Sequence, residues 1–372
     1  MKVALVHDWL TGMRGGEKVL LSLVRLFPDA PIFTLLHVRG SVAPEIESRE
    51  IRTTFVQHLP DVDRRYRHYL PLFPAAAGGI DLRGFDLVVS SSHCVAKGVR
   101  PAPSALHVCY CHTPMRYVWD RYPDYFGPGR VSPLAGRLIR YVAAGLRAWD
   151  TASAVRVHRF VANSRYVAGR IRRYYGRASA VIPPPVDTEF FTPGADAPGE
   201  FDLLVSALAP YKRVEIALEA YRGTGRPLRI VGTGPERAAL ERKAPPEVSF
   251  LGWVNDEALR DLYRRSRAAL MLGVEDFGIV PLEAMACGRP AIVFGEGGGL
   301  ETVVPGETGL VFREATPEAL RAAVDSLETV RFNGVTLRAR AEAHSRRTFE
   351  SRFRAFVDGA LAEGRSAALQ PA

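Results

Sequence analysis

Cysteines and long apolar segments are scarce in this sequence. Four cysteines in 372 residues are too few and too irregularly spaced to form a disulfide framework or a zinc site. No segment approaches the roughly 20 apolar residues that span a bilayer. The first apolar run, Val3–Val6, is shorter than that of a signal peptide, and no cleavage site follows it. We therefore expect a cytoplasmic protein in a reducing compartment, whose contact with the inner face of the cell membrane is at most peripheral.

Signatures of nucleic-acid binding are missing as well, although the chain is basic. It contains no zinc-finger spacing, RNP-type aromatic motif or helix-turn-helix signature, so no nucleic-acid partner is expected. The net charge is +9, and the excess is concentrated between Arg116 and Arg177, where only Asp120, Asp124 and Asp150 oppose many arginines. Such a surface suits an anionic membrane or a phosphate-bearing substrate, and a solvated arginine-rich helix explains it equally well.

Short apolar runs alternate with longer helical patterns along the whole chain. After a strand at Val3–His7, the apolar residues of Glu17–Phe27 recur with the period of a helix. The other apolar runs are nearly continuous, which is typical of parallel strands buried on both faces. They are Leu87–Ser90, Leu106–Tyr110, Arg159–Ala162, Leu203–Val205, Leu228–Val231, Val248–Phe250, Ala269–Met271 and Ala291–Val293. This alternation predicts an α/β protein with parallel sheets.

A proline-rich passage divides the alternation into two halves. Pro183–Pro185 leads into Thr192–Gly199, and consecutive prolines neither continue a helix nor occupy the middle of a sheet. The chain is also longer than one hydrophobic core usually supports. We therefore predict two doubly wound, Rossmann-like domains, residues 1–185 and the residues from 186 onward, facing each other across a cleft. Ligands of such sheets bind beyond the carboxyl ends of the strands.

The segment that follows the strand at Ala269–Met271 favours a phosphate site. Gly278 permits a close backbone approach, and Pro281 suits the first position of a helix, so we expect a helix that begins near residue 280. The start of a helix presents free amide groups to an anion. The amide groups in question are those of Phe277, Gly278, Ile279 and Val280.

Two carboxylates flank this expected phosphate site. Glu275 and Glu283 would repel a phosphate, so their plausible partners are hydroxyl groups on either side of it. A nucleotide sugar supplies both, on its ribose and on its sugar. A structural interpretation stays open, in which Glu283 complements the helix dipole and Glu275 is solvated.

Further loops follow other strands of the second half. Lys212 and Arg213 lie between a strand and a helix, where two cations would neutralise a diphosphate. Gly232–Gly234 and Gly295–Gly299 also follow strands, and tight turns explain these glycines as well as a ligand does. In the first half, Gly15 and Gly16 open a helix and could meet an anion.

A histidine ends one strand of the first half. His112 lies in Tyr110–Asp120, together with an arginine and several aromatic residues. A lone histidine is more often a satisfied structural residue than a catalytic one, and the residues alone do not decide between these roles.

The segment Glu275–Glu283 resembles the signature of glycosyltransferase family 4, in which two glutamates are separated by seven residues. Other segments resemble the same family in the same order, over nearly the whole chain. The resemblance implies the GT-B fold, an acceptor-binding domain at 1–185, a nucleotide-sugar-binding domain at 186–347, and a terminal helical region at 348–372 that crosses back to the first domain.

The resemblance also implies roles for individual residues. Glu275 would contact the donor sugar and Glu283 the ribose, and His112, Glu275 and Lys212 would be the catalytic residues. Many members carry arginine where this chain has Ala207, so that Arg213 would replace it beside Lys212. The implied donor-binding residues are Gly15, Gly16, Arg213, Gly232, Gly234, Val254, Phe277, Gly278, Ile279, Val280 and Glu283.

The resemblance further implies a retaining transfer of a hexose, without a metal and without a cofactor other than the nucleotide-sugar co-substrate. The sequence agrees, since no Asp-x-Asp motif follows a strand. The segments around His7–Glu17, Ser90–Lys97 and His112–Asp120 resemble most those of bacterial mannosyltransferases of surface polysaccharide assembly, including lipopolysaccharide. GDP-mannose is then the preferred donor and a glycan or lipid-linked molecule the acceptor, with the arginines between 137 and 173 on the membrane surface.

Two other functions stay open, and a third is disfavoured by the sequence. A transferase that uses a UDP-sugar and a non-catalytic protein that binds a nucleotide sugar both stay open. A dinucleotide oxidoreductase is disfavoured, because Gly12–Gly16 does not form the Gly-x-Gly-x-x-Gly fingerprint after the first strand.

Overall fold

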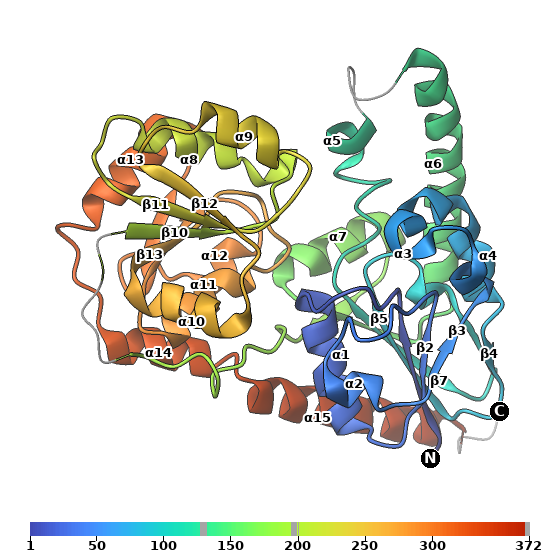
Figure 1. The fold of residues 1–372 in the computed structure, drawn as a ribbon. Helices are drawn as coiled ribbons and strands as arrows, with labels where there is room; N and C mark the ends of the chain where they lie inside the picture. The colour runs from blue at the N-terminus through green and yellow to red at the C-terminus, as the bar shows by residue number, and fades with distance from the viewer. Residues whose placement is uncertain (127–131, 195–198, 200, 369–372) are drawn as a thin grey trace. The chain divides into compact units, whose positions relative to one another are not determined.

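The computed structural model describes residues 1–126, 132–194, 199 and 201–368. The chain forms two units, each with its own parallel sheet (Figure 1). The first unit comprises Met1–Pro185 and Phe349–Ala372, and the second comprises Val186–Thr348. Of the predicted linker, residues 195–198 lie outside the described residues. No described helix is both long enough and apolar enough to cross a membrane.

The first unit is built on seven parallel strands in the order β3-β2-β1-β5-β7-β8-β9. Their bounds are β1 Val3–His7, β2 Ile32–Thr34, β3 Ile51–Thr53, β5 Leu87–Ser92, β7 Leu106–Cys111, β8 Arg159–Ala162 and β9 Ser179–Val181. Two short parallel strands, β4 (Asp81–Leu82) and β6 (Arg100–Pro101), form a separate small sheet. The order reverses between β1 and β5, so the crevice for a ligand is expected where these two strands end.

Helices and short helical turns surround this first sheet. The α-helices are α1 Gly15–Leu26, α2 Pro44–Glu47, α3 Val62–Arg65, α4 Phe73–Gly78, α5 Tyr122–Phe126, α6 Pro133–Ala154 and α7 Arg165–Tyr175. The 3₁₀ turns are η1 Phe55–His58, η2 Tyr66–Leu72 and η3 Ala96–Gly98. The expected helix at Glu17–Phe27 is α1, which begins two residues earlier, at Gly15.

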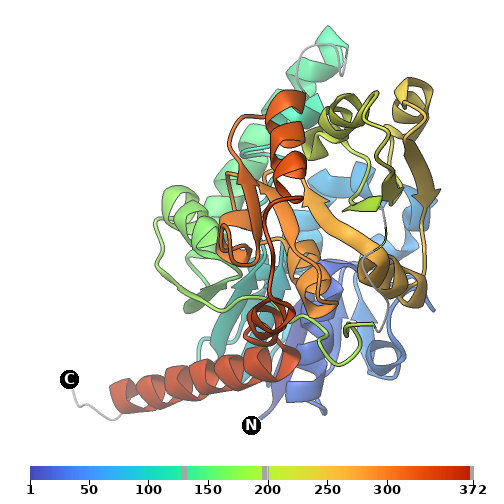
Figure 2. The ribbon, with the colours of Figure 1, turned by 90° about the vertical axis from the view of Figure 1, so that its left-hand side faces the viewer.

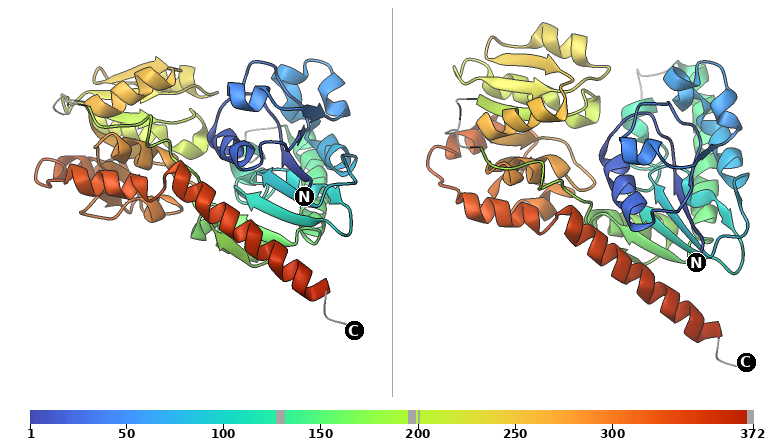
Figure 3. Two further views of the ribbon diagram at one scale, coloured as in Figure 1. Left: turned by 90° about the horizontal axis from the view of Figure 1, so that it is seen from below. Right: turned by 60° about the horizontal axis from the view of Figure 1, so that its bottom comes forward.

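The last helix of the chain, α15 (Arg346–Ala368), completes the core of the first unit. Phe349, Phe353 and Val357 are buried against residues of α1 and of the first sheet. Figures 2 and 3 show α15 as one long helix (red), and Figure 2 shows it passing alongside α1 (blue). Aromatic burial explains why this segment folds against α1, since each ring removes a large apolar area from water.

The second unit has six parallel strands in the order β12-β11-β10-β13-β14-β15. Their bounds are β10 Phe201–Val205, β11 Leu228–Val231, β12 Val248–Gly252, β13 Ser266–Met271, β14 Ala291–Phe294 and β15 Gly309–Phe312. The order reverses between β10 and β13. The loops that follow these two strands therefore flank the expected ligand crevice of this sheet.

Helices cover both faces of the second sheet. One face carries α8 (Val214–Tyr221), α9 (Arg237–Lys243) and α13 (Pro317–Ser326), which share a core with Leu204 and Leu270. The other carries α10 (Asp256–Arg265), α11 (Ile279–Ala286) and α14 (Gly334–Glu342). The remaining short elements are η4 (Pro210–Lys212) and α12 (Gly299–Thr302).

All nine strands expected from apolar runs are present, which confirms the α/β class with parallel sheets. The helix expected near residue 280 is α11, and it begins at Ile279. Pro281 is therefore its third residue and not its first. Proline is still tolerated there, because the third amide of a helix has no partner inside the helix.

Candidate functional site

Lys212 and Glu275 meet at the crevice of the second sheet. Lys212 ends η4 in the loop after β10, and Glu275 lies in the loop after β13. The Lys212 ammonium group donates a hydrogen bond to Glu275 Oε1, and both side chains are largely buried, with 16% and 18% of their surface exposed. A cation and a carboxylate from two different loops are therefore paired where the strand order reverses.

Glu283 lies inside the unit beside the same loop, in the second turn of α11. Its side chain is buried, and its Oε2 accepts a hydrogen bond from the hydroxyl group of Tyr263 at 2.9 Å. Burial and the charge of Glu283 raise the pKa of Tyr263 well above its ordinary value, so the phenol keeps its proton and donates. Tyr263, on α10, thereby fixes the direction of the carboxylate.

The start of α11 supplies amide groups next to these two glutamates. Gly278 precedes the helix with a φ of 96°, a conformation that glycine adopts without strain. Ile279 and Val280 are the first helical residues, whose amide groups lack partners inside the helix. Phe277 is buried in the core with its ring near His344, so only its backbone remains for contact with a ligand.

Of the two cations predicted to clamp a diphosphate, only Lys212 is paired with Glu275. Arg213 adopts a φ of 56°, and its guanidinium group lies over the ring of Phe294 at 4.6 Å from the centroid. Its Nη1 atom is buried without a hydrogen-bond partner among the described residues. Ala207, where the family resemblance leads one to expect arginine, is exposed.

The glycines after β11 are required by packing. A Cβ atom on Gly232 would lie 1.9 Å from the carbonyl oxygen of Ser206, and one on Gly234 would lie 2.2 Å from that of Leu208. The loop after β11 therefore presses directly on the loop that carries Lys212. Val254, after β12, is partly buried against the core that contains α10 and α11.

In the first unit, His112 lies within a network of polar side chains where β1, β5 and β7 end. Its Nε2 is 2.8 Å from Ser91 Oγ, and Ser91 Oγ is 3.1 Å from Nδ1 of His7. The Nε2 atom of His7 in turn lies 3.7 Å from Glu17 Oε1. We refer to Glu17, His7, Ser91 and His112 as the histidine network.

Gly15 and Gly16 open helix α1 directly beside the histidine network. A Cβ atom on Gly16 would lie 3.4 Å from Cε1 of His7 and 3.8 Å from Nε2 of His112. The Glu17 carboxylate also accepts a hydrogen bond from the backbone amide of Arg14 at 3.0 Å, which closes the first turn of the helix. The predicted residues Gly16 and His112 are thus brought together.

Burial controls the protonation of this region. It lowers the pKa of His112 to about 3, and the nearby His93 and His7 act in the same direction, so His112 is neutral near pH 7. For Glu17, burial raises the pKa, but its contact with His7 outweighs that effect and the carboxyl group is ionised. Asp8 is held as an anion by His93 and by four backbone amides at 2.6–3.0 Å.

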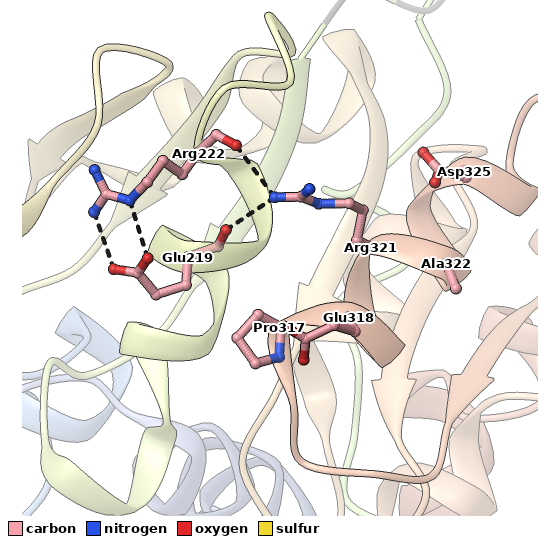
Figure 4. A pocket seen from close by; sticks show the side chains of 7 residues that line it. All are labelled: Glu219, Arg222, Pro317, Glu318, Arg321, Ala322 and Asp325. Atoms are coloured by element: carbon pink, nitrogen blue, oxygen red, sulfur yellow. Dashed lines mark hydrogen bonds and ion pairs between the residues drawn. The ribbon is translucent and has the colours of Figure 1, made fainter.

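A hollow elsewhere in the second unit contains none of the predicted site residues. It lies between α8 and α13 and is lined by Glu219, Arg222, Pro317, Glu318, Arg321, Ala322 and Asp325 (Figure 4). Arg321 there donates hydrogen bonds to backbone carbonyls of Glu219, Ala220 and Arg222. These bonds cap the end of α8, which gives the arginine a structural role. No cluster of three or more His, Cys, Asp or Glu side chains suited to a metal is found in the described part of the chain.

Tyr263, His7, Glu17 and Ser91 were missed as site residues by sequence reasoning. Tyr263 reaches Glu283 from another helix, and Ser91 reaches His112 from a neighbouring strand. A signal existed for His7, because it ends the first strand and ligands were expected beyond the carboxyl ends of the strands.

Solved structures with the same arrangement of elements show the fold class. Sucrose-phosphate synthase from Thermosynechococcus elongatus is 18% identical, with a TM-score of 0.73 over 98% of this chain and 100% of that one. HepE from Anabaena, in complex with UDP, is 15% identical, with a TM-score of 0.70 over 96% of this chain and 100% of that one. The protein is therefore a two-domain α/β protein of the GT-B class.

Two family models match consecutive parts of the chain. Residues 13–190 match the model of Glycosyltransferase Family 4, and residues 186–347 match the model of glycosyl transferases group 1. The chain thus contains a glycosyltransferase family 4 domain followed by a glycosyl transferases group 1 domain. A GDP-mannose-dependent alpha-(1-6)-phosphatidylinositol monomannoside mannosyltransferase of Mycolicibacterium smegmatis is 34% identical over 44% of this chain and 51% of its own length. The chain thus matches about half the length of this relative.

Proposed function

We propose that the protein is a retaining hexosyltransferase that uses a nucleotide-sugar donor bound by its second unit. The observation that carries the proposal is the pairing of Lys212 with Glu275 beside the start of α11 and the buried Glu283. A cation and helix amides suit a diphosphate, while the two carboxylates suit hydroxyl groups on either side of it. The matches to the two glycosyltransferase family models support the same assignment.

In the proposed reaction, the bond between C1 of the donor hexose and the diphosphate oxygen breaks. A bond from C1 to the acceptor oxygen forms on the same face, and the acceptor proton passes to the departing phosphate. Lys212, Arg213 and the amides of α11 would stabilise the charge that develops on the diphosphate, without a metal. Glu275 would hold the hexose, Glu283 the ribose, and His112 would orient reacting groups.

GDP-mannose is the donor that we propose, with a glycan or lipid-linked acceptor in surface polysaccharide assembly. The name of the mycolicibacterial relative, which is 34% identical, supports a mannosyl donor carried on GDP and a lipid acceptor. A UDP-sugar is the second candidate, because HepE, which shares the fold, binds UDP and UDP-glucose. A panel of donors separates the two.

A peripheral contact with an anionic membrane is also proposed, through α6. Leu138 and Tyr141 expose 66% and 81% of their surface, and the exposed Arg137 and Arg140 lie beside them. Apolar and aromatic residues next to arginines suit an interface with anionic lipid. We expect the protein to sediment with phosphatidylglycerol vesicles and Arg137→Gln/Arg140→Gln to sediment less; equal sedimentation of both would contradict this contact.

The enzymatic proposal is tested by incubating the purified protein with GDP-mannose, UDP-glucose, UDP-galactose and other nucleotide sugars. Slow hydrolysis of one donor, measured as released nucleoside diphosphate, is the expected result. Saturable binding without release would instead identify a non-catalytic nucleotide-sugar-binding protein. If no donor binds or is hydrolysed, the proposal fails.

A further inference from the structure

The direction of the hydrogen bonds in the histidine network is set by the single proton of the Ser91 hydroxyl group. Ser91 is fully buried, and the rings of His7 and His112 are the hydrogen-bond partners of its hydroxyl group in the described part of the chain. A hydroxyl group has one proton to donate. If that proton points to neither ring, a buried donor is left unsatisfied, which costs about 1–3 kcal/mol. Ser91 therefore donates to one histidine and accepts from the other.

Glu17 decides which histidine receives the proton of Ser91. Its ionised carboxylate lies 3.7 Å from Nε2 of His7, and both groups are buried. In a neutral His7, a proton on Nε2 faces the carboxylate favourably, whereas a lone pair there would be repelled. Nδ1 of His7 then has no proton and accepts from Ser91. Ser91 in turn accepts from Nε2 of His112.

In this arrangement of hydrogen bonds, Nδ1 of His112 carries no proton. His112 is neutral, so it carries one proton, and the direction of the network places that proton on Nε2. No described residue is hydrogen-bonded to Nδ1 of His112. This atom is consequently a hydrogen-bond acceptor that is open to a bound molecule.

We infer that Glu17, His7 and Ser91 are positioning residues that hold His112 in its Nε2-protonated tautomer, so that Nδ1 accepts a hydrogen bond from a sugar hydroxyl group. The catalytic consequence rests on the proposed function. The tautomer itself follows from the three contacts of the network. The ligand it selects is therefore a hydroxyl donor and not an anion, which a bare ring nitrogen would repel.

Protonation of His7 would reverse the network. The charged imidazole donates from both nitrogens, so Ser91 must accept from Nδ1 and direct its own proton to His112. The proton of His112 then moves to Nδ1, and the acceptor is lost. The groups that face His7 are Glu17 on α1, Asp8 after β1, His93 after β5 and His112 after β7. The Nε2-protonated tautomer of His112 therefore requires a neutral His7.

The tautomer is measured by ¹H–¹⁵N NMR of the full-length protein with ¹⁵N-labelled histidine at pH 8. His112→Gln and His7→Gln assign the two rings. We expect Nε2–H for His112 in the wild type and a mixture of tautomers in Ser91→Ala and in the isosteric Glu17→Gln. A proton on Nδ1 in the wild type, or an unchanged tautomer in both variants, would overturn the inference.

The control variant is Ser90→Ala on the same strand. Ser90 Oγ lies 2.9 Å from Nε2 of His107, so this substitution removes a similar buried serine–histidine bond outside the network. His112 should keep its tautomer in this variant. A shift of His112 in Ser90→Ala as large as that in Ser91→Ala would show a general effect of packing and would contradict the inference.

Kinetics give a second measurement that a purely structural role would not change. In Ser91→Ala we expect a loss of kcat of about tenfold or more, and in Ser90→Ala the wild-type kcat. Because the NMR spectra need no turnover, they test the network even if every donor in the panel fails. Conversely, if the enzyme is active but the tautomer of His112 is unchanged in Ser91→Ala and Glu17→Gln, the proposed function stands. The positioning role of the histidine network is then excluded.

Discussion

Tyr263 shows how one residue outside the signature supports a residue inside it. Its hydroxyl group donates to Glu283 at 2.9 Å, and both side chains are buried in the second unit. A buried carboxylate that loses a donor is both less well solvated and less well oriented. The strength with which Glu283 holds a ribose should therefore depend on Tyr263.

We expect Tyr263→Phe to weaken donor binding about tenfold with little change in kcat, because a hydrogen bond to a charged group contributes about 1.5–3 kcal/mol. Donor titration and steady-state kinetics measure the two effects. The matched control is Tyr221→Phe, which removes a tyrosine–carboxylate bond of 2.6 Å to Asp202 in the same unit. Equal losses of donor affinity in the two variants would show that Tyr263 acts only through stability.

At the scale of residues, the spacing of Glu275 and Glu283 was enough to select them as candidates, because both lie close to one helix start. Contacts between residues that are distant in the sequence could not be predicted from spacing. Lys212 is 63 positions from Glu275, and Ser91 is 21 positions from His112. Only the order of the strands brings such residues together, and the sequence analysis did not predict that order.

Among the elements, two loops of the second unit are packed backbone against backbone. The amide of Gly298 donates to the carbonyl of Glu275 at 2.7 Å, and Glu275 pairs with Gly297 in a short parallel bridge. A Cβ atom on Gly298 would lie 2.3 Å from Cα of Phe277. The glycines after β14 thus hold the loop that carries Glu275 in place.

We expect Gly298→Ala to displace that loop, lower the free energy of unfolding by about 1–3 kcal/mol and reduce donor affinity, since the clash is with backbone. Thermal unfolding and donor titration measure the two effects. Gly169→Ala in α7, where a Cβ atom would meet open space, adds the same methyl group without a clash. Donor affinity in Gly298→Ala equal to that of Gly169→Ala would contradict this account of the loops.

Element type was predictable where the apolar signal was strong. The central strands are nearly continuous apolar runs, and all of those predicted are present. The strands that the sequence did not reveal are short, such as β2 (Ile32–Thr34) and β3 (Ile51–Thr53), and β3 is partly exposed at the edge of its sheet. A segment of this length carries too few side chains for a period to be recognised.

At the scale of the whole molecule, the first unit contains both ends of the chain, and the second unit is formed by the residues between them. The rings of Phe349 and Phe353 lie 5.6 Å and 6.3 Å from that of Tyr110 in β7, so the last helix contributes to the core beneath the histidine network. The resemblance implied a terminal helical region at 348–372 that crosses back to the first domain, but it did not indicate which residues the helix contacts there. Those contacts are specified by the shape of the core, which a single sequence does not display.

The proposed function requires that Glu275 participates in the turnover of a nucleotide sugar. The most direct measurement is the rate of nucleoside diphosphate release from the hydrolysed donor by Glu275→Gln, compared with Glu215→Gln. Glu215 is an exposed residue of the same unit, paired with Lys243. The account predicts a loss of about 100-fold or more in Glu275→Gln, with unchanged thermal unfolding, and the wild-type rate in Glu215→Gln. Release at the wild-type rate by a folded Glu275→Gln protein would contradict it.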